Sequence, residues 1–385
     1  MATRTLVAVL VHGGRDYVPA CLESAGGLTG LGADVGVLVL DDASPDEGWS
    51  AEVRDRCAAL GLEYYRSPRN LGIPRNMNLA LRRADARGYD HVVLANSDVI
   101  FPANLVGGLV AAAAQDPEIA SVTAWSNSVS VFSLPNADAR ANLATREAVD
   151  RVSGCLHDHF GARVVDLPVG VGFCMLVPTP VVRRVGLLDP VFGRGYCEEV
   201  DWCLRAAAMG YRHVLAPGVF VYHIGGASSR EVGLLQAAQT SDPANDALID
   251  HRYPHYRRVL REHDERGSIE RVREEGARVL VLGAARERGY VVEASRLDPL
   301  DAGPAPRFVV DPARPGVAVR AVHGGFEGAV DVEDGDVIAT LQRAVGRLPE
   351  RVVLRDRGPA GDRLDEAARA AGVPVEDRFA YPQVV

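Results

Sequence analysis

The sequence contains no lysine: all 42 basic residues among its 385 are arginine. This absence excludes several classes of enzyme. A Walker A phosphate loop and a protein kinase each need a lysine beside the nucleotide phosphates. Pyridoxal-phosphate enzymes and Schiff-base aldolases need a lysine amine as nucleophile. Any phosphate that this protein binds must therefore be neutralised by arginine, by backbone N–H groups or by a metal ion.

A basic surface, long apolar runs and paired cysteines are also scarce. The formal net charge is −9 and the pI about 5.6, which argues against the basic face that nucleic-acid binding requires. No stretch approaches the roughly 18 apolar residues of a membrane span, and the run TLVAVLV is too short for a signal peptide. The six cysteines include no CxxC pair, which favours free thiols. We expect a soluble, cytoplasmic protein that has no transmembrane segment and binds no nucleic acid.

The first hundred residues alternate apolar runs with helical patterns. The apolar runs predict strands at 5–11, 35–41, 62–67 and 91–98. The intervening segments predict helices at 17–28, 49–61 and 75–88. This alternation is typical of an α/β fold with a mostly parallel, doubly wound sheet, in which ligands bind beyond the carboxyl ends of the strands. The polar residues expected at that edge are Asp41, Asp42, Asn96, Ser97 and Asp98.

Three regions are predicted along the chain: an α/β domain over 1–230, a charged helical extension over 231–275 and a small α/β domain over 276–385. In the last region, apolar runs predict strands at 278–283, 289–295, 307–311 and 317–322. Helical patterns cover 336–347 and 362–371. The sequence leaves three roles open for this region: an acceptor-binding module, a surface for homo-oligomerisation or a remnant domain.

Two carboxylate motifs follow predicted strands. In VLVLDDAS, Asp41 is suited to accept a hydrogen bond from the ring N–H of a base or from a ribose hydroxyl. Aspartate and serine also form caps and turns, so both interpretations stay open. In VVLANSDV, the oxygens of Asn96 and Asp98 suit Mg²⁺ or Mn²⁺ shared with substrate phosphates. The alternative for this motif is an Asx turn.

Two further motifs lie downstream. GYCEEVDWCLR places Glu198, Glu199 and Asp201 in the first turn of a predicted helix. The helix dipole tolerates carboxylates there whatever their function, whereas a functional interpretation makes one of them a general base. In VYHIGGAS, His223 ends a predicted strand and precedes a glycine pair. A lone histidine on a strand is usually structural, but this one is placed to complete a metal site begun by Asp98.

In this order and at this spacing, the four motifs resemble family 2 glycosyltransferases of the GT-A fold, over about residues 5–230. VLVLDDASPDEG is similar to the family's strand-end aspartate motif, and RNLGIPRNMNLAL to its N-x-G-x-x-x-x-x-N segment. ANSDV stands where the family has DXD or NND. The longest similarity runs from GFCMLVP through GYCEEVDWCLR to VYHIGG, which resembles the family's small-residue strand, V-G-x-x-D turn, E-D-x-D-x-x-x-R helix and Y-H-x-G-G ending.

The resemblance implies transfer of a sugar, with inversion, from a nucleoside-diphosphate sugar to an acceptor hydroxyl or amine. The acceptor is unspecified: a small molecule, a lipid-linked molecule or a polysaccharide. A divalent metal, Mg²⁺ or Mn²⁺, is implied on Asp98, with Asn96 and His223 as further ligands. Glu199 would be the catalytic base, supported by Glu198 and Asp201. The residues implied to bind the nucleotide sugar are His12, Asp41, Asn70, Arg75, Asn96, Ser97, Asp98 and Gly172.

The chain departs from the family pattern at three places. The DXD motif lacks its first carboxylate, Glu199 replaces the usual aspartate, and VHGG replaces T-Y-N, which puts His12 near the base. A sugar-phosphate nucleotidyltransferase is one alternative, but HGGRD lacks the threonine of the G-x-G-T-R loop and the lysine that goes with it. A catalytically silent nucleotide-sugar-binding subunit is the other. The weakened ANSD motif favours that alternative, and retention of Glu199 and His223 argues against it.

Overall fold

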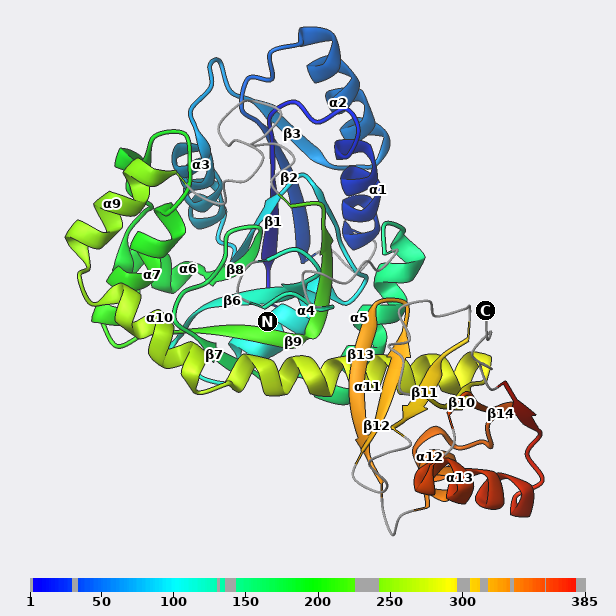
Figure 1. Ribbon diagram of the computed structural model, residues 1–385. Helices are drawn as coiled ribbons and strands as arrows, with labels where there is room; N and C mark the ends of the chain where they lie inside the picture. The colour runs from blue at the N-terminus through cyan, green and yellow to red at the C-terminus, as the bar shows by residue number, and fades with distance from the viewer. Residues whose placement is uncertain are drawn as a thin grey trace, which may run out of the picture. The chain divides into compact units, whose positions relative to one another are not determined.

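The computed structural model describes residues 3–29, 34–129, 132–135, 143–225, 242–295, 305–311, 318–332, 336–356 and 358–378. The chain forms two compact units (Figure 1). Unit 1 comprises Met1–Val131 and Leu143–Ile269, and unit 2 comprises Phe132–Asn142 and Glu270–Val385. The predicted domain boundaries at 231 and 276 stay predictions. Residues 231–241 of the predicted helical extension lie outside the described residues, as does Gly226.

Unit 1 is built on a nine-stranded sheet of order β3-β2-β1-β4-β8-β6-β9-β5, with β7 paired to β9. Its first half is parallel: β1 (Thr5–Val11), β2 (Val35–Asp41), β3 (Glu63–Arg66) and β4 (His91–Asn96). The connecting helices are α1 (Val18–Thr29), α2 (Glu47–Ala59) and α3 (Ile73–Ala86). Figure 1 shows α3 on one side of these strands and α1 and α2 on the other. Because helices cover both faces, the central strand β1 is buried along its whole length and reads as a continuous apolar run.

The second half of this sheet contains one reversed strand, β8 (Cys174–Pro178), which pairs antiparallel with both β4 and β6 (Ile119–Ser126). Strand β9 (Arg212–His223) is parallel to β6, and the short β5 (Val99–Ile100) is antiparallel to β9. The remaining elements are α4 (Leu105–Ala113), α5 (Arg146–Phe160), β7 (Val165–Leu167), α6 (Thr179–Val185), a 3₁₀ turn (Pro190–Phe192) and α7 (Glu198–Ala208). The predicted doubly wound α/β fold is confirmed, with β8 running against its neighbours. Helix α5 and strand β7 were not predicted.

Three helices follow β9 in the described part of the chain: α9 (Pro243–Arg252), α10 (Tyr256–Glu265) and α11 (Ser268–Arg288). The strand predicted at 278–283 is wrong, because this segment belongs to α11. An apolar run as short as the four residues VLVL at 279–282 fits a buried strand or a buried helix equally well. Here the buried residues recur at helical spacing: Ile269, Val272, Ala277, Leu280, Val281 and Ala285. No helix of the described segments is long and apolar enough to cross a lipid bilayer.

Unit 2 contains a six-stranded sheet of order β13-β12-β11-β10-β14-β15. Its strands are β10 (Val291–Ala294), β11 (Arg307–Val310), β12 (Ala318–His323), β13 (Phe326–Asp331), β14 (Arg351–Leu354) and β15 (Val375–Asp377). The helices are α12 (Val337–Val345) and α13 (Pro359–Ala370). The predicted small α/β domain is confirmed, with β10, β11, β12 and both helices near their predicted positions. The sequence interpretation missed β13, β14 and β15.

Candidate active site

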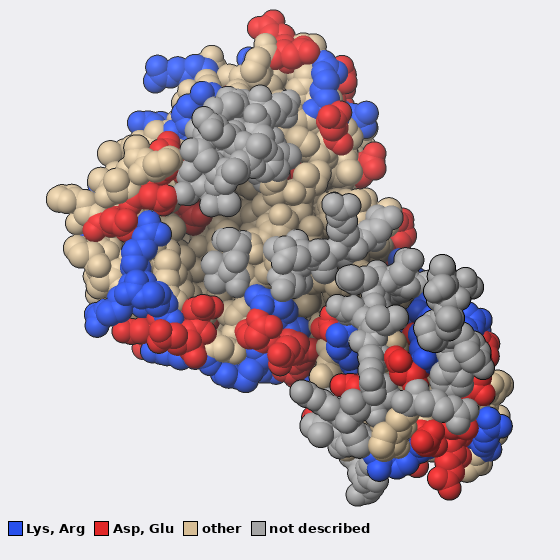
Figure 2. All heavy atoms as spheres, viewed as in Figure 1, with Lys and Arg blue, Asp and Glu red and all other residues tan. Residues whose placement is uncertain are grey.

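One edge of the unit 1 sheet collects most of the predicted site residues. Strands β1, β2, β4 and β9 run in the same direction, so their carboxyl ends meet at this edge. The reversed strand β8 begins there instead, and the Asn96 N–H donates a hydrogen bond to the Phe173 carbonyl just before β8 (2.9 Å). On the face seen in Figure 2, the charged side chains of unit 1 gather toward its periphery, and the described atoms between them are mostly uncharged.

Asp98 and His223 meet because β5 pairs with the end of β9, with Val99 opposite His223. The Nε2 atom of His223 lies 3.3 Å from Oδ1 of Asp98, and the two residues are 7% and 1% exposed. The Nδ1 atom lies 3.0 Å from the Ser128 carbonyl oxygen. A carbonyl only accepts, so Nδ1 carries a proton, and Nε2 is the ring nitrogen that faces Asp98. Phe173 stacks on the imidazole, with ring centroids 5.0 Å apart, and fixes its orientation.

This pair fits a metal site by its chemistry. An imidazole nitrogen that faces a carboxylate oxygen at this distance needs a proton or a metal cation between the two atoms. Metal-binding histidines commonly donate the other ring N–H to a backbone carbonyl, which is the arrangement of His223. Within the described ranges, no third His, Cys, Asp or Glu joins the pair. Asn96 and Ser97 lie beside it at the end of β4, half-buried and buried, and their roles as ligand and donor contact stay predictions.

Glu198 and Glu199 open helix α7 near this edge. Glu198 is 3% exposed and Glu199 is half-buried, and Oε2 of each is buried without a hydrogen-bond partner. Burial raises the pKa of both carboxyls, and for Glu198 the neighbouring Glu199 charge adds to a large rise. At Glu199, backbone hydrogen bonds, including one from Gly172, lower the pKa and partly offset the effect of burial. A carboxylate whose pKa is raised toward neutrality is suited to general base catalysis.

Gly172 and Asp201 are placed by the structure against protein groups. A Cβ on Gly172 would lie 3.9 Å from the Glu199 side chain, so Gly172 packs beside the predicted base. Asp201 is 1% exposed. Its Oδ2 accepts a hydrogen bond from Arg205 Nε (2.9 Å), and its Oδ1 accepts from Arg252 Nη1 (2.8 Å) and Tyr253 Oη (2.9 Å). Asp201 therefore fastens α7 to α9, and any support that it gives to the base is through that attachment.

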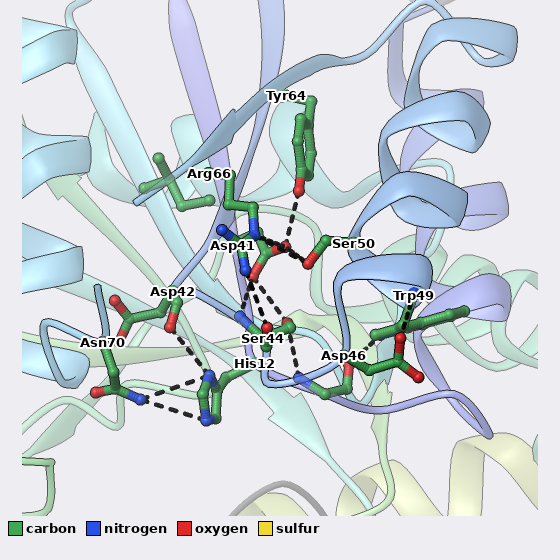
Figure 3. Close-up of polar contacts among 12 residues, drawn as sticks. His12, Asp41, Asp42, Ser44, Asp46, Trp49, Ser50, Tyr64, Arg66 and Asn70 are labelled. Carbon is green, nitrogen blue, oxygen red and sulfur yellow. Dashed lines mark hydrogen bonds and ion pairs between the residues drawn. The ribbon is translucent and has the colours of Figure 1, made fainter. Parts of the chain in front are cut away.

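Asp41 lies at the centre of a cluster of hydroxyl groups at the end of β2 (Figure 3). Its carboxylate is 0% exposed. Oδ1 accepts from the N–H and the Oγ of Ser44 (both 2.8 Å), and Oδ2 accepts from Ser50 Oγ and Tyr64 Oη (both 2.7 Å). Burial alone would raise the pKa of Asp41, but these hydrogen bonds outweigh it and lower the pKa. The contact between Asp41 and a base stays a prediction, and it requires one of these donors to give way.

Asp42 holds the loop that carries Asn70. Its two oxygens accept from the N–H groups of Leu71 (2.7 Å) and Gly72 (2.9 Å). Nδ1 of His12 lies 3.0 Å from the Asp42 carbonyl oxygen, and Nδ2 of Asn70 lies 3.3 Å from Nε2 of His12 (Figure 3). The structure thus brings His12 and Asn70 into contact. The sequence placed Asp42 at this edge without a role, although an acidic pair at a strand end was the available signal.

Arg75 and Asn245 complete the site from two helices. Arg75 is exposed in the first turn of α3, where backbone N–H groups also favour an anion. Nδ2 of Asn245, in α9, lies within 3.1 Å of three carbonyl oxygens just before α7. The sequence interpretation missed Asn245, because a single asparagine on a helix with no motif around it gives no signal.

Comparison with known proteins shows a family similarity in the first part of the chain. Residues 6–163 match the family model described as glycosyl transferase family 2. This match includes the predicted residues from His12 to Asp98 and ends before Gly172, Glu198, Glu199, Asp201 and His223. No curated protein matches the chain.

Several solved structures are similar to the chain at low identity. They include GalNAc-T7 with UDP, GalNAc and Mn²⁺ (14% identity, TM-score 0.46, 57% of this chain and 44% of that one). Another is the mannosyltransferase PcManGT from Pyrobaculum calidifontis with GDP-Man and Mn²⁺ (18% identity, TM-score 0.44, 74% of this chain and 76% of that one). A third is TarS 1–349 of S. aureus with UDP-GlcNAc (12% identity, TM-score 0.43, 74% of this chain and 67% of that one). The chain thus spans less than half of GalNAc-T7. The family match is thus confined to residues 6–163, which are similar to glycosyl transferase family 2.

Proposed function

We propose that this protein transfers a glycosyl group from a nucleoside-diphosphate sugar to an acceptor hydroxyl or amine, with inversion and with the help of a divalent metal ion. The observation that carries the proposal is the Asp98–His223 pair, with Nε2 and Oδ1 at 3.3 Å. The family match over residues 6–163 and the buried carboxylates of α7 support it.

Asp98 and His223 would hold the metal, with Asn96 as the predicted third ligand. A bound Mg²⁺ or Mn²⁺ neutralises the charge that grows on a departing diphosphate. In a chain without lysine, the remaining positive charge comes from the N–H groups at the start of α3 and from Arg75. His12 and Asn70, held by Asp42, would bind the nucleotide beside them.

Glu199 would accept the proton of the acceptor. As the acceptor oxygen or nitrogen bonds to the anomeric carbon, the bond from that carbon to the diphosphate oxygen breaks and the acceptor proton passes to Glu199. A single displacement of this kind inverts the anomeric configuration. Burial raises the pKa of both neighbouring carboxyls, and the resemblance to the family assigns the role of base to Glu199.

Calorimetric titration with UDP, GDP, CDP and dTDP, each with and without Mn²⁺, tests the donor half of the proposal. We expect one nucleoside diphosphate to bind, and to bind much more tightly with Mn²⁺. Replacing both Asp98 and His223 with alanine should remove the metal dependence. The proposal is wrong if no nucleoside diphosphate binds under either condition. Release of pyrophosphate from a nucleoside triphosphate and a sugar phosphate would instead indicate a nucleotidyltransferase.

A further inference from the structure

The turn that precedes α7 has an unusual backbone. Gly193, Gly195, Tyr196 and Cys197 all have positive φ, at 64°, 140°, 74° and 71°. Tyrosine and cysteine rarely adopt this conformation, and two such residues in succession persist only when their surroundings hold them. Glu198 and Glu199 follow directly, so the position of this turn sets where the predicted base lies.

The turn is held on one side by the loop that carries Asn70. The Ile73 N–H donates to the Arg194 carbonyl (3.2 Å). Gly72 packs so tightly that a Cβ there would lie 2.3 Å from the Gly193 oxygen. These backbone contacts fix one face of the turn, but they do not reach the carbonyls of Tyr196 and Gly195.

Those carbonyls are held by α9. The Asn245 amide Nδ2 lies 3.1 Å from the Phe192 oxygen, 2.8 Å from the Gly195 oxygen and 3.0 Å from the Tyr196 oxygen. One side chain thus gathers three carbonyls of the strained turn. The next residue, Asp246, also contacts the turn, with Oδ1 3.5 Å from Cys197 Sγ.

Helix α9 also makes hydrogen bonds to α7 itself. Arg252 lies seven residues after Asn245, two helical turns further on the same face. It donates to Asp201 in the first turn of α7 (2.8 Å) and also pairs with Asp189 (2.9 Å), and Tyr253 donates to Asp201 as well. Helix α9 therefore contacts the chain both before and after the Glu198–Glu199 pair. It lies outside residues 6–163, the part that matches the family model.

We infer that α9 is a positioning element of the active site, and that Asn245 is the residue through which it holds Glu199 in place. This inference rests on the proposed function. Without the amide, the Phe192, Gly195 and Tyr196 carbonyls lose this shared donor, and the backbone at Tyr196 and Cys197 can relax toward ordinary φ values. Such a change would displace the first turn of α7, whereas the donor contacts at His12, Asn70 and Asp98 would remain.

The test compares Asn245→Ala with Asn104→Ala. Asn104 is a matched control, because its amide also binds a carbonyl in unit 1 (Gly218, 3.1 Å) and accepts from Ser153 (2.6 Å). We expect Asn245→Ala to lower kcat by about 100-fold with little change in donor KM, since a displacement of about 1 Å has an effect of this size. We expect Asn104→Ala to retain kcat.

The pH profile supplies a readout that a loss of folded protein does not move. If Glu199 moves into water, its burial-raised pKa falls, so the acid limb of the kcat profile should shift to lower pH in Asn245→Ala. Hydrogen exchange over residues 193–201 should also quicken in that variant and not in the control. If Asn245→Ala does not fold, Asn245→Ser, which keeps one donor, is measured in the same way and should show a smaller shift.

The outcomes separate the two hypotheses. A wild-type protein that binds no nucleoside diphosphate and transfers no sugar overturns the proposed function, and the inference with it. An active wild type whose Asn245 variants keep both kcat and the acid limb overturns the inference alone. Equal losses of kcat in the Asn245 and Asn104 variants, with unshifted profiles, overturn it too, because they reflect general destabilisation.

Discussion

Asp41 and Glu198 of unit 1 are both almost fully buried, and they differ in the groups that surround their carboxyls. At the end of β2, Asp41 accepts four hydrogen bonds, and its pKa is lowered. At the start of α7, Glu198 and Glu199 each have a buried Oε2 without a partner, and their pKa values are raised. The number of hydrogen-bond donors around a buried carboxyl, more than its degree of burial, decides whether the carboxyl stays ionised or can exchange a proton.

Replacing the predicted base gives the largest expected effect. Glu199→Gln keeps the size of the side chain and removes its basicity, so kcat should fall by about 10²–10⁴-fold. Binding of the nucleoside diphosphate, measured by calorimetry, should stay close to that of the wild type. Asn104→Ala serves as the control, because its amide binds Gly218 and Ser153 and makes no contact with α7 that the structure shows. A Glu199→Gln variant that transfers sugar at the wild-type rate would end the assignment of Glu199.

Replacing Asp41, the carboxylate held by four hydrogen bonds, should lower the stability of the fold. Asp41→Ala leaves the donors of Ser44, Ser50 and Tyr64 unpaired in a buried site, which should lower the free energy of unfolding by about 3 kcal/mol. Asp46→Ala is the matched control. That carboxylate caps α2 at the surface, and its loss should cost about 1 kcal/mol. Urea denaturation measures both, and equal losses would show that the Asp41 cluster is unimportant for stability.

The pH dependence of stability should have opposite signs at the two sites. Asp41 has a lowered pKa, so its contribution is present above the pKa of an unfolded aspartate and is lost as pH falls through the folded value. Glu198 has a raised pKa, so its contribution is present in acid and is lost as pH rises. Glu198→Gln should therefore be more stable than wild type at neutral pH, and this advantage should disappear below about pH 4. Denaturation curves from pH 3 to 8 test the sign, and an advantage confined to acid would contradict it.

The smallest expected effect concerns one hydrogen bond of the Asp41 cluster. Tyr64→Phe removes the Oη donor at 2.7 Å and keeps the ring, so it should lower the free energy of unfolding by about 1 kcal/mol. The remaining three donors should still keep Asp41 ionised. Tyr65→Phe on the same strand is the control, and a change of equal size in both variants would show that the Tyr64 hydroxyl has no special role.

The sequence was sufficient for the strand framework and the edge that carries the site. The apolar runs at 5–11 and 35–41 coincide with β1 and β2, because strands covered on both faces read as continuous apolar segments. Polar residues directly after parallel strands had to meet at one edge, and the structure places Asp41, Asp42 and Asp98 at that edge, with Asp98 against His223 as predicted.

What the sequence did not reveal depends on contacts between distant side chains. The donors that occupy Asp41 come from α2 and β3, and Ser50 and Tyr64 carry no mark of this role in the sequence. The role of Asn245 also leaves no signal in the sequence. Its partners are backbone carbonyl oxygens, which every residue type has. The helix over 278–283 was missed because the short apolar run VLVL does not distinguish a strand from a helix.

The two-residue strand β5 has a consequence for how the protein acquires its site. This strand directly follows β4 in the chain and pairs with the end of β9, more than a hundred residues later. Contacts between such distant residues form late, because the entropy of loop closure must be overcome before they stabilise anything. A fragment that ends at residue 163 would keep Asp98 and lack β9, and so lack His223. The Asp98–His223 pair therefore requires that β9 has joined the sheet and paired with β5.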